Sequence, residues 1–597
     1  MQHETLEADV IVVGAGTAGC VLAARLAEAD PQLRILVLEA GEHTLNGSAI
    51  RVPGDFMKLS QPDSTRATHY ECEPSDSMVG RKLHIDSARC VGGGSAINYM
   101  MYTRGAASDY DDWEQKYENP GWGFDGMLPM FKKFETYEVD PTSPWHGTSG
   151  PMHITLRGPL SELSEEWLHT ALAFDDRPVV SDPNDFHTFN AYGVWPKYIN
   201  SAGVRQDAGH LFLYPKVLAP DSNVTLRVES QVARVILQSG RVVGVEFKDQ
   251  EGLHVAKSNK MVVLSAGAIG TPQILERSGI GSPQVLGAAG IACEVELPGV
   301  GENYQDHNVV DSLYLRVRGD DRCAYLRGDP EVVAKAWETY NNGGQGVLST
   351  NREDCGVKLR PSTKELESLG GAFNEEWKRF FEPAPDKPLL FHGILPNPPV
   401  DIPDMPDDRE HFRAFAYSGY PFSRGSIHIR SGDADIHPRF DSGFFSNLAD
   451  MGPLIWQYKL CREVARRMPS YRGEMPALHP AFKPGSNVAC STKHLPVAMD
   501  AASILYDAED DAAIEQWVRQ NVNSMWHSMG TCAMKPHSAG GVVDPRLNVY
   551  GIHGLKIADL SICPSNVSAN TASTALAIGE KAACIISDDL GIHVLPA

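Results

Sequence analysis

The sequence contains no C-x-x-C pair, no spacing typical of zinc ligands and no apolar run long enough to cross a membrane. We therefore expect neither a metal site nor a membrane span. Its eleven cysteines are scattered, and an odd number at these spacings predicts reduced thiols in a cytosolic type of compartment. Basic residues are also scarce, since 53 Lys and Arg stand against 76 Asp and Glu, for a formal net charge of −23. That balance argues against nucleic acid as a partner, because nucleic-acid phosphates bind basic surfaces.

The two ends of the chain carry no recognisable targeting signal. Residues 1–8 are polar and lead directly into an apolar run, unlike a secretory signal peptide. Residues 593–597 do not match the S-K-L type of peroxisomal signal. We expect a cytoplasmic protein and leave a peroxisomal location open.

What the chain does have is length and an ordinary globular composition. Its 597 residues are too many for one small domain, and 42% of them are hydrophobic, so we expect two or more packed domains. Apolar residues near helical spacing predict a helix over Met451–Met468. The acidic run 507–511 is interpreted as the solvated start of a helix rather than a metal site, because no His or Cys joins it.

A glycine-rich turn follows the first apolar run, residues 10–13. Gly14, Gly16 and Gly19 form the pattern G-x-G-x-x-G and open a helical stretch that reaches Ala29. A second apolar run, 35–38, ends in Glu39, at the distance where a ribose-binding carboxylate is expected. Strand, turn, helix and strand in this order predict a dinucleotide site with its pyrophosphate at the helix N-terminus. The alternative is a turn without a ligand, and up to this point NAD and FAD are equally open.

Three consecutive glycines, Gly92 to Gly94, form a second cluster. They are followed by Ser95 and by the run Asn98-Tyr99-Met100-Met101. Consecutive glycines let backbone N–H groups approach a large planar or anionic ligand. A flexible turn is the alternative interpretation, but it does not account for the flanking Asn, Tyr and Met residues.

Residues 88–102, and residues 267–281 after the buried-strand run 261–265, resemble the two signatures of the glucose–methanol–choline (GMC) oxidoreductases. Within that family, residues 91–105, 421–429 and 558–564 are most similar to the fungal methanol (alcohol) oxidases. The resemblance implies a mixed α/β fold. Its Rossmann-like FAD-binding domain is discontinuous, and its substrate domain is built on a mainly antiparallel sheet flanked by helices. We place the FAD-binding domain at 1–155, 224–312 and 539–597, and the substrate domain at 156–223 and 313–538.

The resemblance also implies which residues hold a non-covalently bound FAD. Val232 offers its backbone to the adenine, Asn98 lies near the flavin N5 edge, and the helix that starts at Thr571 directs its positive end at the flavin. The full expected set comprises Gly14, Gly16, Thr17, Ala18, Gly19, Glu39, Ala40, Gly92, Gly94, Ser95, Asn98, Tyr99, Met100, Val232, Trp526, His527, Asp559, Leu560, Asn570 and Thr571.

The expected chemistry lies near the C-terminus. One of 21 histidines is by itself uninformative, but His527 follows an aromatic residue and begins H-x-x-G-T-C, which resembles the catalytic loop of the family. Imidazole suits the role of general base because alcohol oxidation requires removal of a weakly acidic hydroxyl proton. Asn570 stands where the family places His or Asn opposite this base, and its amide would donate to the substrate oxygen. The alternative for Asn570 is a helix N-cap.

The predicted function is oxidation of short-chain primary alcohols of the methanol or ethanol type to aldehydes, with O2 as acceptor and H2O2 as product. Hydride passes to flavin N5 while His527 acts as base. Tyr99, Met101, Phe422 and Trp526 are the expected walls of the substrate pocket, with ordinary core packing as the alternative for each.

Three other functions stay open at this point. They are an aryl- or longer-chain alcohol oxidase, a quinone-dependent dehydrogenase and a flavin-binding protein without turnover. His527 and Asn570 together argue against the last. The chain is shorter than the methanol oxidases near 486–505 and at its end, so both a monomer and a homo-oligomer are left open.

Overall fold

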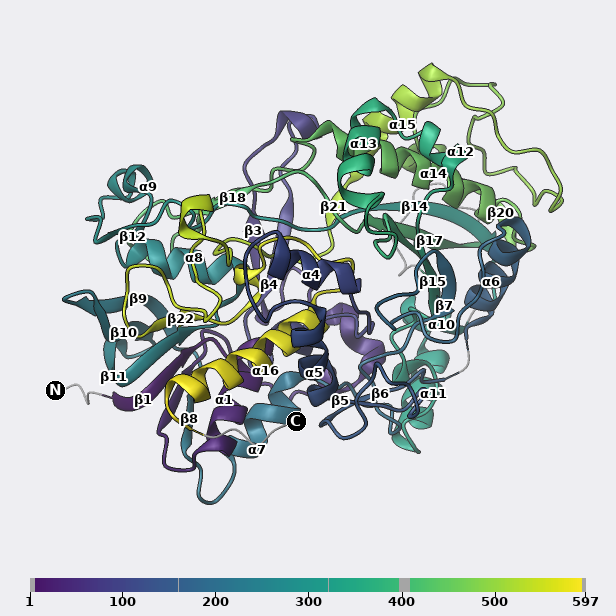
Figure 1. Ribbon diagram of the computed structural model, residues 1–597. Helices are drawn as coiled ribbons and strands as arrows, with labels where there is room; N and C mark the ends of the chain where they lie inside the picture. Colours follow the sequence, from purple (N-terminus) through teal and green to yellow (C-terminus); the bar gives the residue numbers. More distant parts are fainter. Residues whose placement is uncertain (1–5, 159, 320, 397–407, 593–597) are drawn as a thin grey trace.

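The computed structural model describes residues 6–592, apart from 159, 320 and 397–407. The two ends on which the targeting expectations depend, 1–5 and 593–597, lie outside the described residues. Two seven-stranded sheets form the framework, one on each side of the view in Figure 1.

The first sheet is the predicted nucleotide-binding framework. Its strands are, in spatial order, β8 (Val224–Arg227), β2 (Ile35–Leu38), β1 (Leu6–Val13), β11 (Gly252–Leu264), β10 (Arg241–Asp249) and β9 (Gln231–Gln238), with β22 (Leu555–Ile557) paired to β11. Strands β8, β2, β1, β11 and β22 run parallel, whereas β9, β10 and the first half of β11 form an antiparallel meander. Residues 10–13 and 35–38 are almost fully buried, as continuous apolar runs in a parallel sheet should be.

Helices from opposite ends of the chain lie side by side against this sheet (Figure 1). Helix α1 (Thr17–Ala29) packs along α16 (Ala572–Asp589), and the Arg25 guanidinium lies 2.7 Å from a carboxylate oxygen of the buried Glu580. Gly579 allows this close packing, since a Cβ there would lie 2.8 Å from the Ala18 carbonyl oxygen. The predicted first helix is therefore confirmed, and the C-terminal helix is brought to the first glycine-rich turn.

The second sheet is antiparallel throughout, as the resemblance implied. Its strands are, in spatial order, β20 (Tyr471–Glu474), β14 (Asn308–Val317), β17 (Arg409–Ser418), β16 (Leu390–Pro396), β15 (Cys355–Leu359) and β7 (Ala191–Val194), with β21 (Asn523–Ser524) paired to β14. Helices α6 (Glu162–Phe174) and α14 (Met451–Ala465) pack against it. The Cys461 sulfur of α14 lies 2.9 Å from Nδ1 of His392 on β16. The mixed α/β fold class is thus confirmed, and the domain boundaries given above stay a prediction.

Two local predictions can be compared with these elements. The helix expected over 451–468 is α14, which ends at Ala465, slightly earlier than predicted. Helix α15 (Ala508–Asn521) begins within the acidic run 507–511, and the Asp507 carboxylate caps it by accepting from the N–H groups of Glu509 and Asp510 at 2.9 and 3.0 Å. The acidic run is therefore a helix start, because carboxylates satisfy free N–H groups there.

The remaining elements are shorter or peripheral. The other helices are α2 (Ser48–Arg51), α3 (Gly94–Ile97), α4 (Ala107–Gln115), α5 (Phe124–Phe134), α7 (Tyr214–Val217), α8 (Gly267–Arg277), α9 (Pro283–Ala288), α10 (Asp321–Leu326), α11 (Pro330–Asn341), α12 (Thr363–Glu367) and α13 (Gly371–Glu376). The small two-stranded sheets pair β3 (Ala67–Glu71) with β4 (His84–Ala88), β5 (Glu135–Tyr137) with β6 (Met152–Ile154), β12 (Ile280–Gly281) with β13 (Val295–Glu296), and β18 (Ser426–His428) with β19 (Arg439–Asp441).

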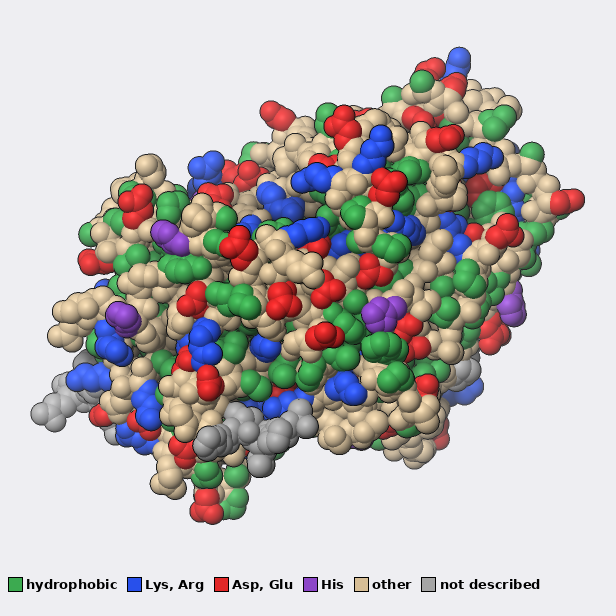
Figure 2. Space-filling model, in the orientation of Figure 1, with side chains coloured by type: hydrophobic (Ala, Val, Ile, Leu, Met, Phe, Trp, Pro, Cys, Tyr) green, Lys and Arg blue, Asp and Glu red, His purple; other side chains and the backbone are tan. Residues whose placement is uncertain are grey.

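Within the described part of the chain, no helix has the length and apolar character needed to cross a bilayer. The eleven cysteines are all free. Figure 2 shows acidic and basic side chains interspersed over one face of the molecule.

Candidate active site

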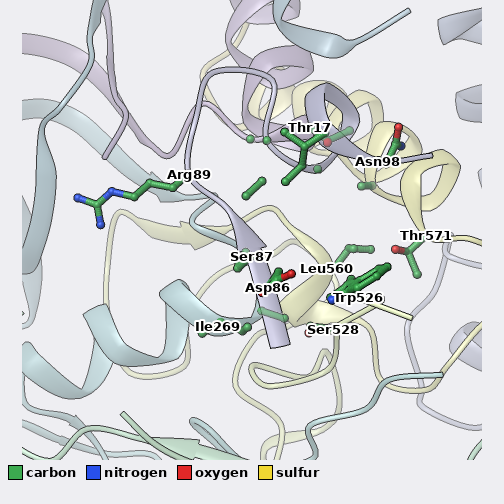
Figure 3. A pocket seen from close by; sticks show the side chains of 18 of the residues that line it. Thr17, Asp86, Ser87, Arg89, Asn98, Ile269, Trp526, Ser528, Leu560 and Thr571 are labelled. Carbon is green, nitrogen blue, oxygen red and sulfur yellow. The ribbon is translucent and has the colours of Figure 1, made fainter. Parts of the chain in front are cut away.

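A cavity of about 540 Å³ is lined by residues of both large sheets. At one end are the first glycine-rich turn and Glu39, and the wall continues past His527 to strands β14 and β17. Figure 3 shows part of this lining, with Arg89 at one end of the view and Asn98 and Thr571 at the other. The N-terminal turn and the C-terminal loop, far apart in sequence, therefore belong to one cavity.

The turn between β1 and α1 admits only glycine at its first position. Gly14 has a φ of 101°, and a Cβ there would lie 2.5 Å from the Ser265 carbonyl oxygen. Gly19 lies outside the lining and allows helix packing instead, since its Cβ would approach the Gly14 oxygen to 2.1 Å. The N-cap of α1 is Gly16, which has no side chain to accept hydrogen bonds from the first N–H groups of the helix. The first N–H groups of α1 are therefore available to an anionic ligand.

Glu39 lies at the end of β2 and is only 6% exposed. Its carboxylate accepts from the N–H groups of Ala15 and Gly41, both at 2.8 Å. Burial raises the pKa of this carboxyl group above its usual range. Because a carboxylate can accept about four hydrogen bonds, it keeps acceptor capacity toward the cavity that it lines.

The second glycine cluster packs directly on the first. A Cβ on Gly93 would lie 2.6 Å from the Cα of Gly16. The Thr17 hydroxyl donates to the Gly92 carbonyl at 3.3 Å and accepts from the Ser95 N–H at 3.2 Å. Gly93 and Gly94 line the cavity, whereas Gly92 lies behind them as support. Because Gly93 and Gly94 have no side chains, this wall of the cavity consists of exposed backbone.

Asn98 is oriented by a residue that the sequence did not single out. Its Oδ1 accepts from the Met100 N–H at 3.1 Å and from the Arg205 guanidinium at 2.9 Å. Arg205 is fully buried, and burial lowers its pKa to about 10. Since Oδ1 is engaged, the amide of Asn98 presents donor N–H groups to the cavity.

His527 lies in the loop after β21 and is 8% exposed. The buried Asp306 fixes this loop, since its carboxylate accepts from the His527 backbone N–H at 2.9 Å. Burial and the neighbouring His307 hold the pKa of His527 well below its usual range, and burial lowers the pKa of His307 to about 4. Both imidazoles are therefore neutral at neutral pH.

The hydrogen bonds of His307 determine the tautomer of His527. His307 Nε2 lies 3.1 Å from the carbonyl oxygens of both Gly419 and Val567, which can only accept, so it carries the proton. Its Nδ1 is then an acceptor, 2.7 Å from Nδ1 of His527. His527 must donate from Nδ1, and this leaves an unprotonated Nε2 at the cavity.

Asn570 faces that nitrogen. Its Nδ2 lies 3.3 Å from His527 Nε2, while its Oδ1 accepts from the hydroxyls of Thr103 at 3.0 Å and Tyr417 at 3.1 Å. Because both hydroxyl donors point at Oδ1, the NH2 group is the end that faces the base. A proton acceptor and an uncharged donor thus converge on one point of the cavity.

Most of the predicted residues lie on this cavity. Those in the lining are Gly14, Gly16, Thr17, Ala18, Glu39, Ala40, Gly94, Ser95, Asn98, Tyr99, Met100, Met101, Val232, Trp526, His527, Asp559, Leu560, Asn570 and Thr571. Trp526 is 44% exposed, and its ring lies 6.0 Å from that of Tyr99, so this pair is not ordinary core.

Phe422 is the exception among the expected pocket walls. It lies outside the described lining of the cavity, with its ring 5.9 Å from Phe380 and 6.3 Å from Phe381. Its backbone N–H donates to Asp450 at 2.7 Å. The expectation for Phe422 is corrected, because this turn directs the ring into an aromatic cluster of the core.

Several residues of the site carried no role in the sequence interpretation. Asp306 and His307 directly precede β14, and none of the motifs described above includes them. Thr103 and Tyr417, which orient Asn570, are distant in sequence and carried no signal. The same is true of three charged residues of the lining, Asp311, Glu353 and Arg413.

Comparisons with known proteins agree with this geometry. Family models described as GMC oxidoreductase match residues 8–309 and 421–579. The chain belongs to the GMC oxidoreductase family. Among GMC oxidoreductases it is 38% identical to the alcohol oxidase of Candida boidinii, and 36% identical to alcohol oxidase 1 of Komagataella phaffii. Each match covers 98% of this chain and 95% of the relative.

A solved structure shares the fold. Formate oxidase of Aspergillus oryzae, in a variant solved to follow FAD modification, superposes with a TM-score of 0.83 at 22% identity. The match covers 99% of this chain and all of that chain. At this identity the likeness supports the GMC fold and says nothing of the substrate.

Proposed function

We propose that this GMC oxidoreductase oxidises short-chain primary alcohols to aldehydes, using FAD and O2 and releasing H2O2. The observation that carries the proposal is the 3.3 Å approach of the Asn570 amide to an unprotonated His527 Nε2 inside the cavity. The similarity to two fungal alcohol oxidases over nearly the whole chain supports the same reaction.

Two residues have complementary roles: His527 accepts a proton, and Asn570 donates a hydrogen bond to the substrate oxygen. The alcohol hydroxyl donates to His527 Nε2, which takes and holds its proton as the C–H bond breaks. The Asn570 NH2 group donates to the same oxygen as negative charge develops on it, and it remains a donor at every pH. FAD, when bound, supplies the hydride acceptor and passes the electrons to O2. Half-exposed Trp526 and buried Met101 restrict the space beside the reacting carbon.

The cavity fits FAD on three observations. Gly94, where a Cβ would meet no atom within 4 Å, leaves room for a close ligand, the α1 N-terminus offers free N–H groups, and Glu39 keeps acceptor capacity. Gly14, Gly16 and Glu39 would hold the adenosine half.

The flavin end would lie between the second glycine cluster and α16. Ser95, Asn98 and Thr571 line that part of the cavity together with Gly94. Thr571 is the N-cap of α16, so the positive end of the helix faces this region. The flavin would therefore meet backbone N–H groups and amide donors.

We further propose that FAD is held without a covalent bond. Cys90 lines the cavity, but burial raises the pKa of its thiol far above the usual range and keeps it un-nucleophilic. Release of free FAD on acid precipitation checks this point, whereas retention of yellow colour by the precipitate would contradict it.

The deciding experiment mixes the purified holoenzyme with ethanol in the absence of air. We expect the flavin band to bleach, and admitted air to restore it with one H2O2 formed per aldehyde. His527→Ala should slow bleaching at least about 10²-fold, the range of a general base. His153→Ala is the matched control, since the His153 side chain is 45% exposed, pairs with Glu138 at 2.6 Å and lies outside the described lining of the cavity.

Other outcomes would identify the alternatives. A flavin unchanged by every primary alcohol would indicate a binding protein without turnover. Bleaching that a quinone reverses but air does not would indicate a dehydrogenase. A His527→Ala loss of only a few-fold would contradict the assigned base.

A further inference from the structure

The cavity continues beyond the reacting groups along the antiparallel sheet. On β17, residues 413, 415 and 417 line the cavity, whereas residues 412, 414 and 416 are buried on the opposite face of the sheet. Tyr417 is the one that bonds Asn570. Arg413 lies four residues from Tyr417, roughly 14 Å away at Cα by strand geometry. Electrostatic interactions of Arg413 with Tyr99 and Glu353 indicate that these three side chains lie in the same part of the cavity.

This far end is charged. The Arg413 guanidinium donates from Nη1 to Asp311 on β14 at 2.9 Å, and both side chains keep part of their surface open. Arg413 Nε is buried and has no hydrogen-bond partner among the described residues. The Arg413–Asp311 ion pair therefore has no net charge, and the Arg413 Nε–H group remains available as a donor.

Glu353 and Tyr99 add two more polar groups without partners. Glu353 is 6% exposed, and its carboxyl group makes no hydrogen bond or ion pair within the described structure. Burial raises its pKa to about 8, against the opposing effect of nearby Arg413, so it is mainly a neutral acid at pH 7. The Tyr99 hydroxyl likewise has no described partner, and burial raises its pKa to about 12.

Three unpartnered polar groups at one end of a cavity indicate a polar ligand atom. Buried donors and acceptors left unpaired cost free energy, so a substrate that satisfies them binds better than one that does not. Methanol or ethanol is too short to reach them from His527. An anionic group on the ligand would be repelled by Asp311, and a cationic group would be repelled by Arg413. A neutral hydroxyl can donate to one group and accept from another.

We propose that the preferred substrate is a short-chain primary alcohol with a second hydroxyl at the far end of its chain, bound by Arg413, Glu353 and Tyr99. The inference rests on the proposed function of this cavity and names the substrate class within it. The primary hydroxyl that reacts lies at His527 and Asn570, and the distal hydroxyl lies among the three polar groups.

The test compares substrates of one chain length that differ only in the distal group. For the holoenzyme we expect kcat/KM for 1,4-butanediol to exceed that for 1-butanol by about tenfold or more. The cationic 4-amino-1-butanol and the anionic 4-hydroxybutyrate should both lie below the diol. The pair 1,6-hexanediol and 1-hexanol repeats the comparison with a chain that is two carbons longer.

Variants assign the effect to the residues. Tyr99→Phe and Glu353→Met should each lower the ratio of diol to 1-butanol by about threefold or more, because each removes a hydrogen-bonding group. Arg234→Met removes a remote exposed guanidinium that pairs with Glu246 at 3.0 Å, and should leave the ratio unchanged.

Failure of this inference differs from failure of the proposed function. Equal kcat/KM for 1-butanol and 1,4-butanediol, or preference for the amino or carboxylate analogue, would overturn the inference and leave alcohol oxidation standing. A ratio that survives both Tyr99→Phe and Glu353→Met would overturn the assigned residues. A flavin that no alcohol bleaches would overturn the proposed function itself.

Discussion

His307 holds His527 in a single tautomer. Their Nδ1 atoms lie 2.7 Å apart, and the other nitrogen of His307 is committed to two backbone carbonyls. Only one arrangement of two protons satisfies these contacts, and it leaves the Nε2 lone pair of His527 facing Asn570. His307 is thus a positioning residue that acts through the proposed base.

The first prediction concerns a variant that lacks the acceptor Nδ1 of His307. In His307→Leu, the buried Nδ1–H of His527 loses its partner, so the wrong tautomer becomes populated and flavin reduction should slow by about tenfold or more. The acid limb of the pH–rate profile should also move to higher pH, because His307 contributes to the low pKa of His527. Stopped-flow reduction across pH measures both.

The control for this variant is His307→Asn. An Asn side-chain oxygen can accept near the place of His307 Nδ1, so this variant should keep most of the rate. An acid limb that does not move in His307→Leu would show that His307 is merely structural.

The second prediction concerns Asn570, the proposed hydrogen-bond donor to the substrate oxygen. Asn570→Asp keeps the shape and the hydrogen bonds from Thr103 and Tyr417, but it replaces the NH2 group by an acceptor. We expect kcat to fall by about 10²–10³, the range for loss of one such donor. Asn341→Asp, at the exposed end of α11, is the matched control. A loss below about tenfold would argue against Asn570 as the donor to the substrate oxygen.

The third prediction concerns retention of FAD. In Glu39→Gln, an amide N–H2 group must face one of the N–H donors of Ala15 and Gly41, so the turn and its ligand contacts weaken together. A lost buried hydrogen bond costs about 1–3 kcal/mol. The dissociation constant for FAD should therefore rise about fivefold or more. The flavin-to-protein absorbance ratio after dialysis measures this, with exposed Glu7→Gln as control. Full flavin content after dialysis would contradict the role given to Glu39.

The fourth prediction follows from the low pKa of His307, about 4 in the folded protein. The unfolded chain takes up a proton near the ordinary value of about 6.5, whereas the folded chain does so only near 4. Acidification therefore favours unfolding within this window. Between pH 6.5 and about 4, each pH unit should cost up to about 1.4 kcal/mol of unfolding free energy for this residue, and no further loss is expected below that window.

Denaturant unfolding at pH 7.5, 6.0 and 5.0 measures the effect. His307→Asn cannot titrate, so the difference in stability between it and the unaltered protein should change over the same range. Parallel pH profiles for the two proteins would refute the assignment.

The sequence alone was sufficient where a role follows from adjacent residues. The turn at Gly14, Gly16 and Gly19, and Glu39 after the next strand, were predicted because strand, turn and helix are set by local geometry. His527 was predicted as the base from its own loop, and that role is part of the proposed function. Roles set by partners distant in the chain were not: Asn98 depends on Arg205, and Phe422 packs into a core cluster.

By itself the sequence determined that this chain forms a nucleotide-binding α/β unit and that it carries a candidate base and donor. The tertiary structure alone decided what surrounds them. Residues 307 and 417 approach the reacting pair because β14 and β17 are neighbours in a sheet formed by long-range pairing. The same pairing sets Asp311 beside Arg413 and so makes the far end of the cavity polar. Register between distant strands depends on the whole packed core, which no local pattern encodes.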